Sequence, residues 1–139
     1  MKKTTTILVL LLSFFQTTHA QGERYRIAKN YYLNKGYSIG QEWYNDLKQG
    51  QYFTKSFLFK KYTEYAVVAL SEDTDVQDVD IEILTAADDI YEKDTQTDAL
   101  AVVNFTPSFS RNLTIKAINY RSGTPNYASR VYFFVAYRE

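Results

Sequence analysis

Near residues 23–35, apolar side chains recur every three or four positions, as Tyr25, Ala28 and Tyr32 do. This spacing places them on one side of an α-helix, with polar residues on the other side. Gly36 follows, and glycine commonly ends a helix in the left-handed conformation. The pattern therefore predicts a short amphipathic helix that docks on the rest of the protein through its tyrosine rings.

After a polar stretch that contains Gly40 and Gly50, the period of the apolar residues changes to two. In residues 51–60, phenylalanines occupy alternate positions, as expected for a strand with one buried face. Polar turns such as RSGTPN separate the later apolar segments. Further strand signals lie at residues 65–70, 79–83, 90–92, 100–105, 113–118 and 129–137.

One helix followed by many short strands predicts an all-β protein. We expect an antiparallel, jelly-roll-like β-sandwich of about seven or eight strands with a short N-terminal helix. Residues 21–50 are predicted to form the helix and a lead-in, and residues 51–139 the sandwich. The two parts together make a single domain.

The last predicted strand is apolar on both faces. Val131, Phe133 and Val135 alternate with Tyr132 and Phe134. A two-sided strand of this kind is either covered on both faces or part of a binding surface. We expect it to be covered, on one face by the N-terminal helix.

The first 20 residues, MKKTTTILVLLLSFFQTTHA, have the layout of a secretory signal peptide. Their apolar run, residues 7–15, is shorter than the roughly 20 residues that span a bilayer. We expect cleavage after Ala20 and a secreted or periplasmic protein that does not span a membrane. The remaining 119 residues carry 14 basic and 16 acidic side chains, which does not favour binding to nucleic acid.

Two residue types are scarce in this chain. It has no cysteine, so an exported form is stabilised by its core and not by disulfides. Its one histidine, His19, lies in the predicted signal peptide. The exported form would therefore lack the residues of Ser-His-Asp and Cys-His nucleophilic catalysis. We expect no enzyme, with only carboxylate, Lys or Tyr chemistry and oxygen-ligand metals left open.

Acidic residues concentrate in the middle of the chain. Eleven of the sixteen acids lie in residues 72–98, where Lys93 is the only basic residue. In the stretch SEDTDVQDVDIEIL, residues 71–84, the period of two directs Val79 inward and places Asp78 and Asp80 on the opposite face. Three readings of this cluster stay open: a solvated rim that protects the sheet, a calcium site, or a pair of catalytic carboxylates.

A calcium site would draw on both the loop and the strand, since calcium accepts six to eight oxygen ligands in flexible geometry. The spacing of an EF-hand loop is absent. The candidate ligands are Asp73, Asp75, Asp78 and Asp80, with Glu72 and Asp94 in addition.

Residues 50–120 resemble the bacterial pre-peptidase C-terminal (PPC) domain and secreted single-domain proteins similar to it. The resemblance rests on Asp78-Val79-Asp80-Ile81, on Asp94, and on Val103-Asn104-Phe105-Thr106-Pro107. It implies a β-sandwich that is not catalytic and is similar to calcium-responsive collagen-binding modules of secreted collagenases.

These observations predict an exported, non-catalytic β-sandwich that binds an envelope or extracellular protein or glycan. Modulation by calcium follows if the calcium reading of the acidic cluster holds. One alternative is a structural or assembly component of the cell envelope that acts through protein–protein contacts. A carboxylate-dependent hydrolase is a further alternative. The sequence predicts neither the ligand nor the oligomeric state.

Overall fold

The computed structural model describes residues 22–94 and 96–139. The predicted signal peptide, residues 1–20, and the predicted cleavage site after Ala20 lie outside the described residues. Within the described part, no helix is long and apolar enough to cross a membrane.

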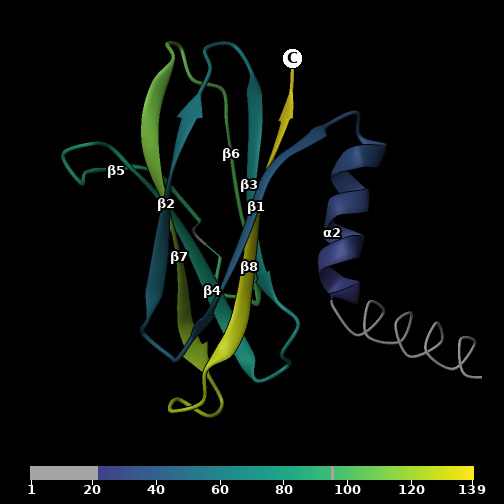
Figure 1. Ribbon diagram of the computed structural model, residues 1–139, viewed down its shortest axis with the longest axis vertical. Coiled ribbons are helices and arrows are strands. Elements are labelled where there is room, and N and C mark those ends of the chain that lie inside the picture. The colour runs from purple at the N-terminus through teal and green to yellow at the C-terminus, as the bar shows by residue number, and fades with distance from the viewer. Residues whose placement is uncertain (1–21, 95) are drawn as a thin grey trace, which may run out of the picture.

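Two four-stranded antiparallel sheets pack face to face as a β-sandwich (Figure 1). The strand order is β1-β8-β3-β6 in the first sheet and β2-β7-β4-β5 in the second. Every connection except the β4–β5 hairpin crosses from one sheet to the other, as in a jelly roll. The predicted fold class is confirmed. The strands are β1 (Ser38–Leu47), β2 (Tyr52–Phe59), β3 (Glu64–Ser71), β4 (Val76–Leu84), β5 (Ile90–Lys93), β6 (Leu100–Phe105), β7 (Arg111–Ser122) and β8 (Ser129–Arg138).

The polar stretch after the helix was predicted to be a lead-in, and this is wrong: it forms strand β1, which pairs with β8. β1 is an edge strand that buries only Leu47 and half-buries Trp43 on the inner side. Its pairing shifts register between Ile39 and Glu42, around Gly40. An edge strand with few buried side chains lacks the apolar alternation by which strands are recognised in a sequence.

Between the sheets lies the main core, in which aromatic rings contact one another. Phe133 of β8 is fully buried, and its ring centroid lies 4.8 Å from that of Trp43 and 5.0 Å from that of Phe53. The alternate phenylalanines of β2 point into this core, as the period of two predicts.

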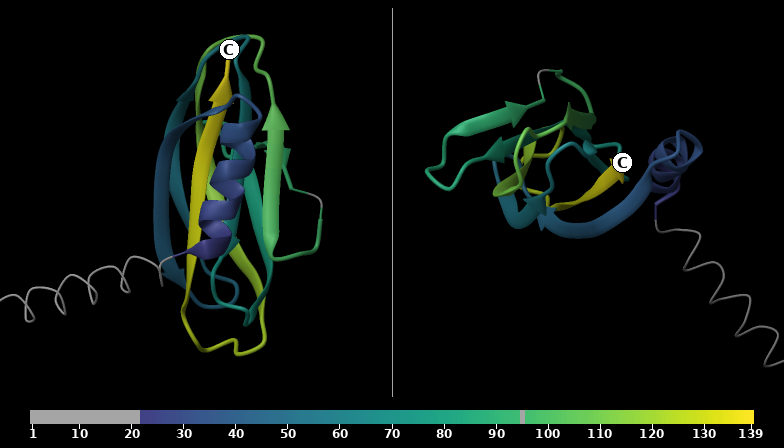
Figure 2. Two further views of the ribbon diagram at one scale, coloured as in Figure 1. Left: turned by 90° about the vertical axis from the view of Figure 1, so that its right-hand side faces the viewer. Right: turned by 90° about the horizontal axis from the view of Figure 1, so that it is seen from above.

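Helix α2 (Glu23–Asn34) lies along the outer face of the first sheet (Figure 2). Tyr25 stacks on Tyr132 of β8 at 4.9 Å, and Tyr32 packs edge-on against Phe134 at 6.1 Å. The helix thus covers the second apolar face of β8, as predicted. Gly36 follows the helix with a φ of 85°, the left-handed conformation predicted for it.

Removal of the Phe133 ring should destabilise the fold strongly. Phe133→Ala is expected to lower the free energy of unfolding by about 3–5 kcal/mol, because a fully buried ring leaves a cavity. Tyr127→Ala, at an exposed position of the β7–β8 connection, should change it by less than about 0.5 kcal/mol. Urea denaturation followed by circular dichroism measures both values. Similar losses in the two variants would contradict this account of the core.

Candidate functional site

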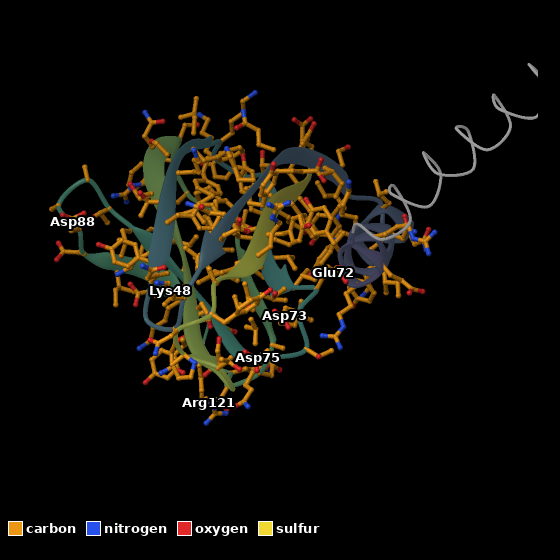
Figure 3. All side chains as sticks on the ribbon, turned by 60° about the horizontal axis from the view of Figure 1, so that its bottom comes forward. Lys48, Glu72, Asp73, Asp75, Asp88 and Arg121 are labelled. Carbon is orange, nitrogen blue, oxygen red and sulfur yellow. The ribbon has the colours of Figure 1, made fainter. Side chains whose placement is uncertain are left out.

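The six acidic residues predicted to bind calcium lie in three separate places. Figure 3 shows Glu72 beside the helix, with Asp73 and Asp75 further towards the β7–β8 end of the sandwich. The groups are Glu72 at the helix, Asp73 and Asp75 in the β3–β4 turn, and Asp78, Asp80 and Asp94 beside the β5–β6 connection.

Glu72 caps the N-terminus of α2. Its carboxylate accepts hydrogen bonds from the backbone N–H groups of Tyr25 (2.6 Å) and Arg24 (3.2 Å). Gly22 occupies the N-cap position and provides no side-chain cap of its own. The first N–H groups of a helix have no partner within it and carry partial positive charge, so a carboxylate there is stabilising. Glu72 therefore fastens the helix to the end of β3.

Asp73 and Asp75 fasten the β3–β4 turn to the β7–β8 connection. Asp73 accepts hydrogen bonds from the Asp75 N–H (2.9 Å) and the Ser129 hydroxyl (2.8 Å). Asp75 accepts bonds from the N–H (2.9 Å) and hydroxyl (3.3 Å) of Thr124. A Cβ atom on Gly123 would lie 2.6 Å from Asp75 Oδ1, so a larger residue there would displace the Asp75 carboxylate. These acids already have neutral donors as partners.

Asp78 departs from the predicted pattern. It was predicted on the solvent face of β4, but it is buried, with only 2% of its surface exposed. The pairing of β4 with β7 shifts register on both sides of Asp78, and such a bulge breaks the alternation of faces. Arg121 lies opposite in register, yet in the described part of the chain no ion pair within 4 Å joins the two.

Two carboxylate oxygens in this third group, Asp78 Oδ1 and Asp94 Oδ2, are buried and have no hydrogen-bond partner. Burial raises the pKa of Asp80 to about 6, and the charge of Asp78, a hydrogen bond shared with it and the charge of Asp94 add to the rise. The pKa of Asp94 is also raised, by burial above all, although N–H groups of Gln96 and Val102 that bond to it oppose the rise. The three carboxylates therefore repel one another at neutral pH.

No three His, Cys, Asp or Glu side chains within residues 22–94 and 96–139 are already arranged to hold a metal ion in common. The acidic cluster of Asp78, Asp80 and Asp94 is nevertheless the place where carboxylate oxygens lack partners. A cation could be held here only if the carboxylates turned towards one another.

An apolar groove that the sequence pattern did not predict lies between α2 and the outer edge of the first sheet. It encloses about 620 Å³, within the range of about 300–1,000 Å³ typical of binding sites. Ile27 and Tyr31, which are 59% and 51% exposed, form its helical wall. Arg24 and Asp98 lie at its polar end. The other lining residues are Ala28, Tyr32, Val68, Leu70, Ser71, Ala99, Leu100 and Val102.

The helical sequence does carry a signal for this groove. Ile27 and Tyr31 are spaced by four residues, next to the stripe of Tyr25, Ala28 and Tyr32 that docks on the sheet. An amphipathic helix needs only one apolar stripe to dock. A second stripe indicates a second apolar surface.

The outer edge of β6, beside the groove, is blocked by two aspartates. The N–H of Leu100 donates to Asp98 Oδ1 (3.2 Å), and the N–H of Val102 donates to the Asp94 carboxylate. Charged side chains on an edge are a common protection against pairing with another strand. This edge therefore does not offer those N–H groups to an added strand.

Comparison with protein-family models finds no match for the chain, and comparison with curated proteins finds no significant similarity.

Loss of the Glu72 carboxylate should loosen the helix. Glu72→Ala is expected to lower the free energy of unfolding by about 1–2 kcal/mol, because two helix N–H groups lose their acceptor. Glu72→Gln keeps an acceptor and should cost less. Urea denaturation gives the stability, and hydrogen exchange in the first turn of α2 gives the local effect. If Glu72→Ala behaved like Glu92→Ala, an exposed control, the capping role would be wrong.

Asp80 should give the protein a pH-dependent stability in the presence of EDTA. Its folded-state pKa of about 6 lies above the unfolded value of about 3.9, so the folded state holds the proton more tightly. The free energy of unfolding should therefore fall as pH rises from about 4 to about 6, and Asp80→Asn should remove this component. Urea denaturation across that range, compared between wild type and variant, tests it. Parallel pH profiles would contradict the assignment.

Proposed function

We propose that this protein is an exported, non-catalytic binding module that holds an amphipathic helix of an envelope or extracellular protein. The observation that carries the proposal is the apolar groove between α2 and β6, with Ile27 and Tyr31 exposed on its wall. Binding sites in proteins are typically concave and apolar, with a few polar groups. Export rests on the sequence of the first 20 residues.

A protein partner fits this groove better than a glycan. The floor consists of aliphatic side chains, Val68 and Leu70 from β3 and Leu100 and Val102 from β6. Sugar hydroxyl groups would lose their hydrogen bonds to water on such a surface, and a buried polar group without a partner costs free energy. Burial of apolar side chains of a protein on the same surface is favourable, because it removes apolar area from water.

A helix fits better than a strand. The edge N–H groups of Leu100 and Val102 already have carboxylate acceptors, so an added strand would find them occupied. A helix satisfies its own backbone groups and needs only an apolar surface.

Charge favours an acidic partner. Residues 23–35 carry four basic side chains and one acidic side chain, Glu23. Lys29 pairs with Glu42 at 2.5 Å, but in the described part of the chain no acidic group lies within 4 Å of the charged groups of Arg24, Arg26 or Lys35. A second copy of α2 in the groove would bring like charges together, which is unfavourable. Acidic residues flanking the apolar stripe of the partner helix would be attracted.

Two observations support a non-catalytic role. The predicted exported form has neither histidine nor cysteine. The groove contains one carboxylate side chain, that of Asp98, whereas hydrolysis by carboxylates uses a pair. The cluster of Asp78, Asp80 and Asp94 contributes no residue to the lining of the groove.

Site-specific crosslinking in the native host tests the proposal. p-Benzoylphenylalanine at position 27 or 100 should crosslink, on irradiation, to one protein, and peptide mapping should place the crosslink in an acidic amphipathic helix. A synthetic peptide of that helix should bind the purified protein. Ile27→Asp should weaken this binding by about tenfold or more, as expected when one apolar contact of roughly 1.5–3 kcal/mol is lost.

The same photo-reactive residue at position 58, exposed on the second sheet, is the matched control and should not capture this protein. Polydisperse adducts sensitive to glycosidases would indicate a glycan instead. Crosslinked dimers with concentration-dependent self-association would indicate an assembly component. No adduct at either groove position would overturn the proposal.

A further inference from the structure

The acidic cluster of Asp78, Asp80 and Asp94 contains a buried carboxyl group with an oxygen that has no partner in the described part of the chain. Asp78 is 98% buried, and its Oδ1 has no hydrogen-bond partner. A carboxylate removed from water without a partner is strongly unfavourable, so such a group either keeps a proton or binds a cation. This oxygen is the observation that distinguishes the cluster from an ordinary acidic surface.

The backbone, and not the side chains, brings the three acids together. Asp78 and Asp80 lie on β4, whereas Asp94 follows β5. The N–H of Asp94 donates to the carbonyl of Ile81, and the N–H of Val79 donates to the carbonyl of Asp98, both at 2.9 Å. These bonds hold both ends of the β5–β6 connection along β4. The acids therefore stay close although their charges repel.

Lysine and arginine do not compensate the cluster. Lys116 is paired with Glu82 at 3.7 Å, and no basic group lies within 4 Å of Asp78, Asp80 or Asp94 in the described part of the chain. A second buried oxygen, Asp94 Oδ2, also lacks a donor. The unpartnered oxygens therefore come from two segments, β4 and the residue after β5.

We propose that Asp78, Asp80 and Asp94 form a calcium site that fastens the β5–β6 connection to β4. The three side chains offer oxygen ligands, which suit calcium, and its flexible coordination tolerates carboxylates that have to turn to meet it. Glu72, Asp73 and Asp75 are not ligands, because their oxygens hold the helix and the β7–β8 connection. None of the three residues lines the groove.

The competing explanation is a proton shared between Asp78 and Asp80. A shared proton would also relieve the repulsion, as it does in other carboxylate pairs. The two explanations differ in what stabilises the protein at neutral pH. A cation site responds to calcium at constant pH, whereas a shared proton responds to pH alone.

Thermal unfolding with calcium tests the site on the purified protein after treatment with EDTA and dialysis. Calcium at neutral pH should raise the melting temperature by about 5 °C once it is tenfold above its dissociation constant, expected in the range of about 10⁻⁴ to 10⁻³ M. Magnesium should do much less, because it requires a tight octahedron and loses its water reluctantly. Hydrogen exchange should slow with calcium at the amides of Val79 and Asp94.

Asp78→Asn, Asp80→Asn and Asp94→Asn should each remove most of the calcium response while the fold is retained. Two matched controls replace an aspartate by asparagine outside the cluster, so that the change in charge is the same. Asp88→Asn, in the exposed β4–β5 turn, should leave both the melting temperature and its response unchanged. Asp75→Asn should lower the melting temperature through its lost bonds to Thr124 but keep the response.

Three results would overturn the site: a calcium effect no larger than that of magnesium, a full response in all three cluster variants, or loss of the response in Asp75→Asn. Stabilisation by acid alone, with no response to calcium, would assign the cluster to a shared proton. If Asp78→Asn did not fold, the calcium response of Asp80→Asn and Asp94→Asn would still test the site.

Discussion

The structure depends on strand β8, which is apolar on both faces and therefore has to be covered on both. Its inner face, with Phe133, completes the core between the sheets. Its outer face, with Phe134, would expose a large aromatic surface if α2 did not cover it. Burial of these rings is the driving force that docks the helix, since a 12-residue helix is marginal in water by itself.

Docking of the helix creates the features that bear on function. Glu72, at the end of β3, fixes the helix N-terminus, and this places α2 over the inner strands of the sheet. The helix is too narrow to cover a four-stranded sheet, so the side next to β6 stays open. Ile27 and Tyr31 remain exposed above it. The groove is thus a geometric consequence of one helix on a wide sheet.

The acidic residues differ in how their charges are compensated. Asp73 and Asp75 accept bonds from backbone and hydroxyl donors, which stabilises connections between distant segments. Asp78 and Asp94 each retain an oxygen without a donor. Moving Asp73 or Asp75 towards a ligand would break existing hydrogen bonds and so destabilise the fold. A ligand at Asp78 or Asp94 would instead give a partner to an oxygen that has none. The distinction lies in the hydrogen bonds and not in the residue type.

The sequence by itself determined the fold class, seven of the eight strands, the helix and its end at Gly36, because burial imposes a period of two or 3.6 on apolar residues. Strand β1 was not predicted, because an edge strand buries few side chains and so lacks an apolar alternation. Only the tertiary structure decided which acids meet donors, that a bulge buries Asp78, and that Ile27 and Tyr31 face an open groove. Each of these depends on contacts between residues far apart in the chain, and periodicity along one segment carries no information about its partners.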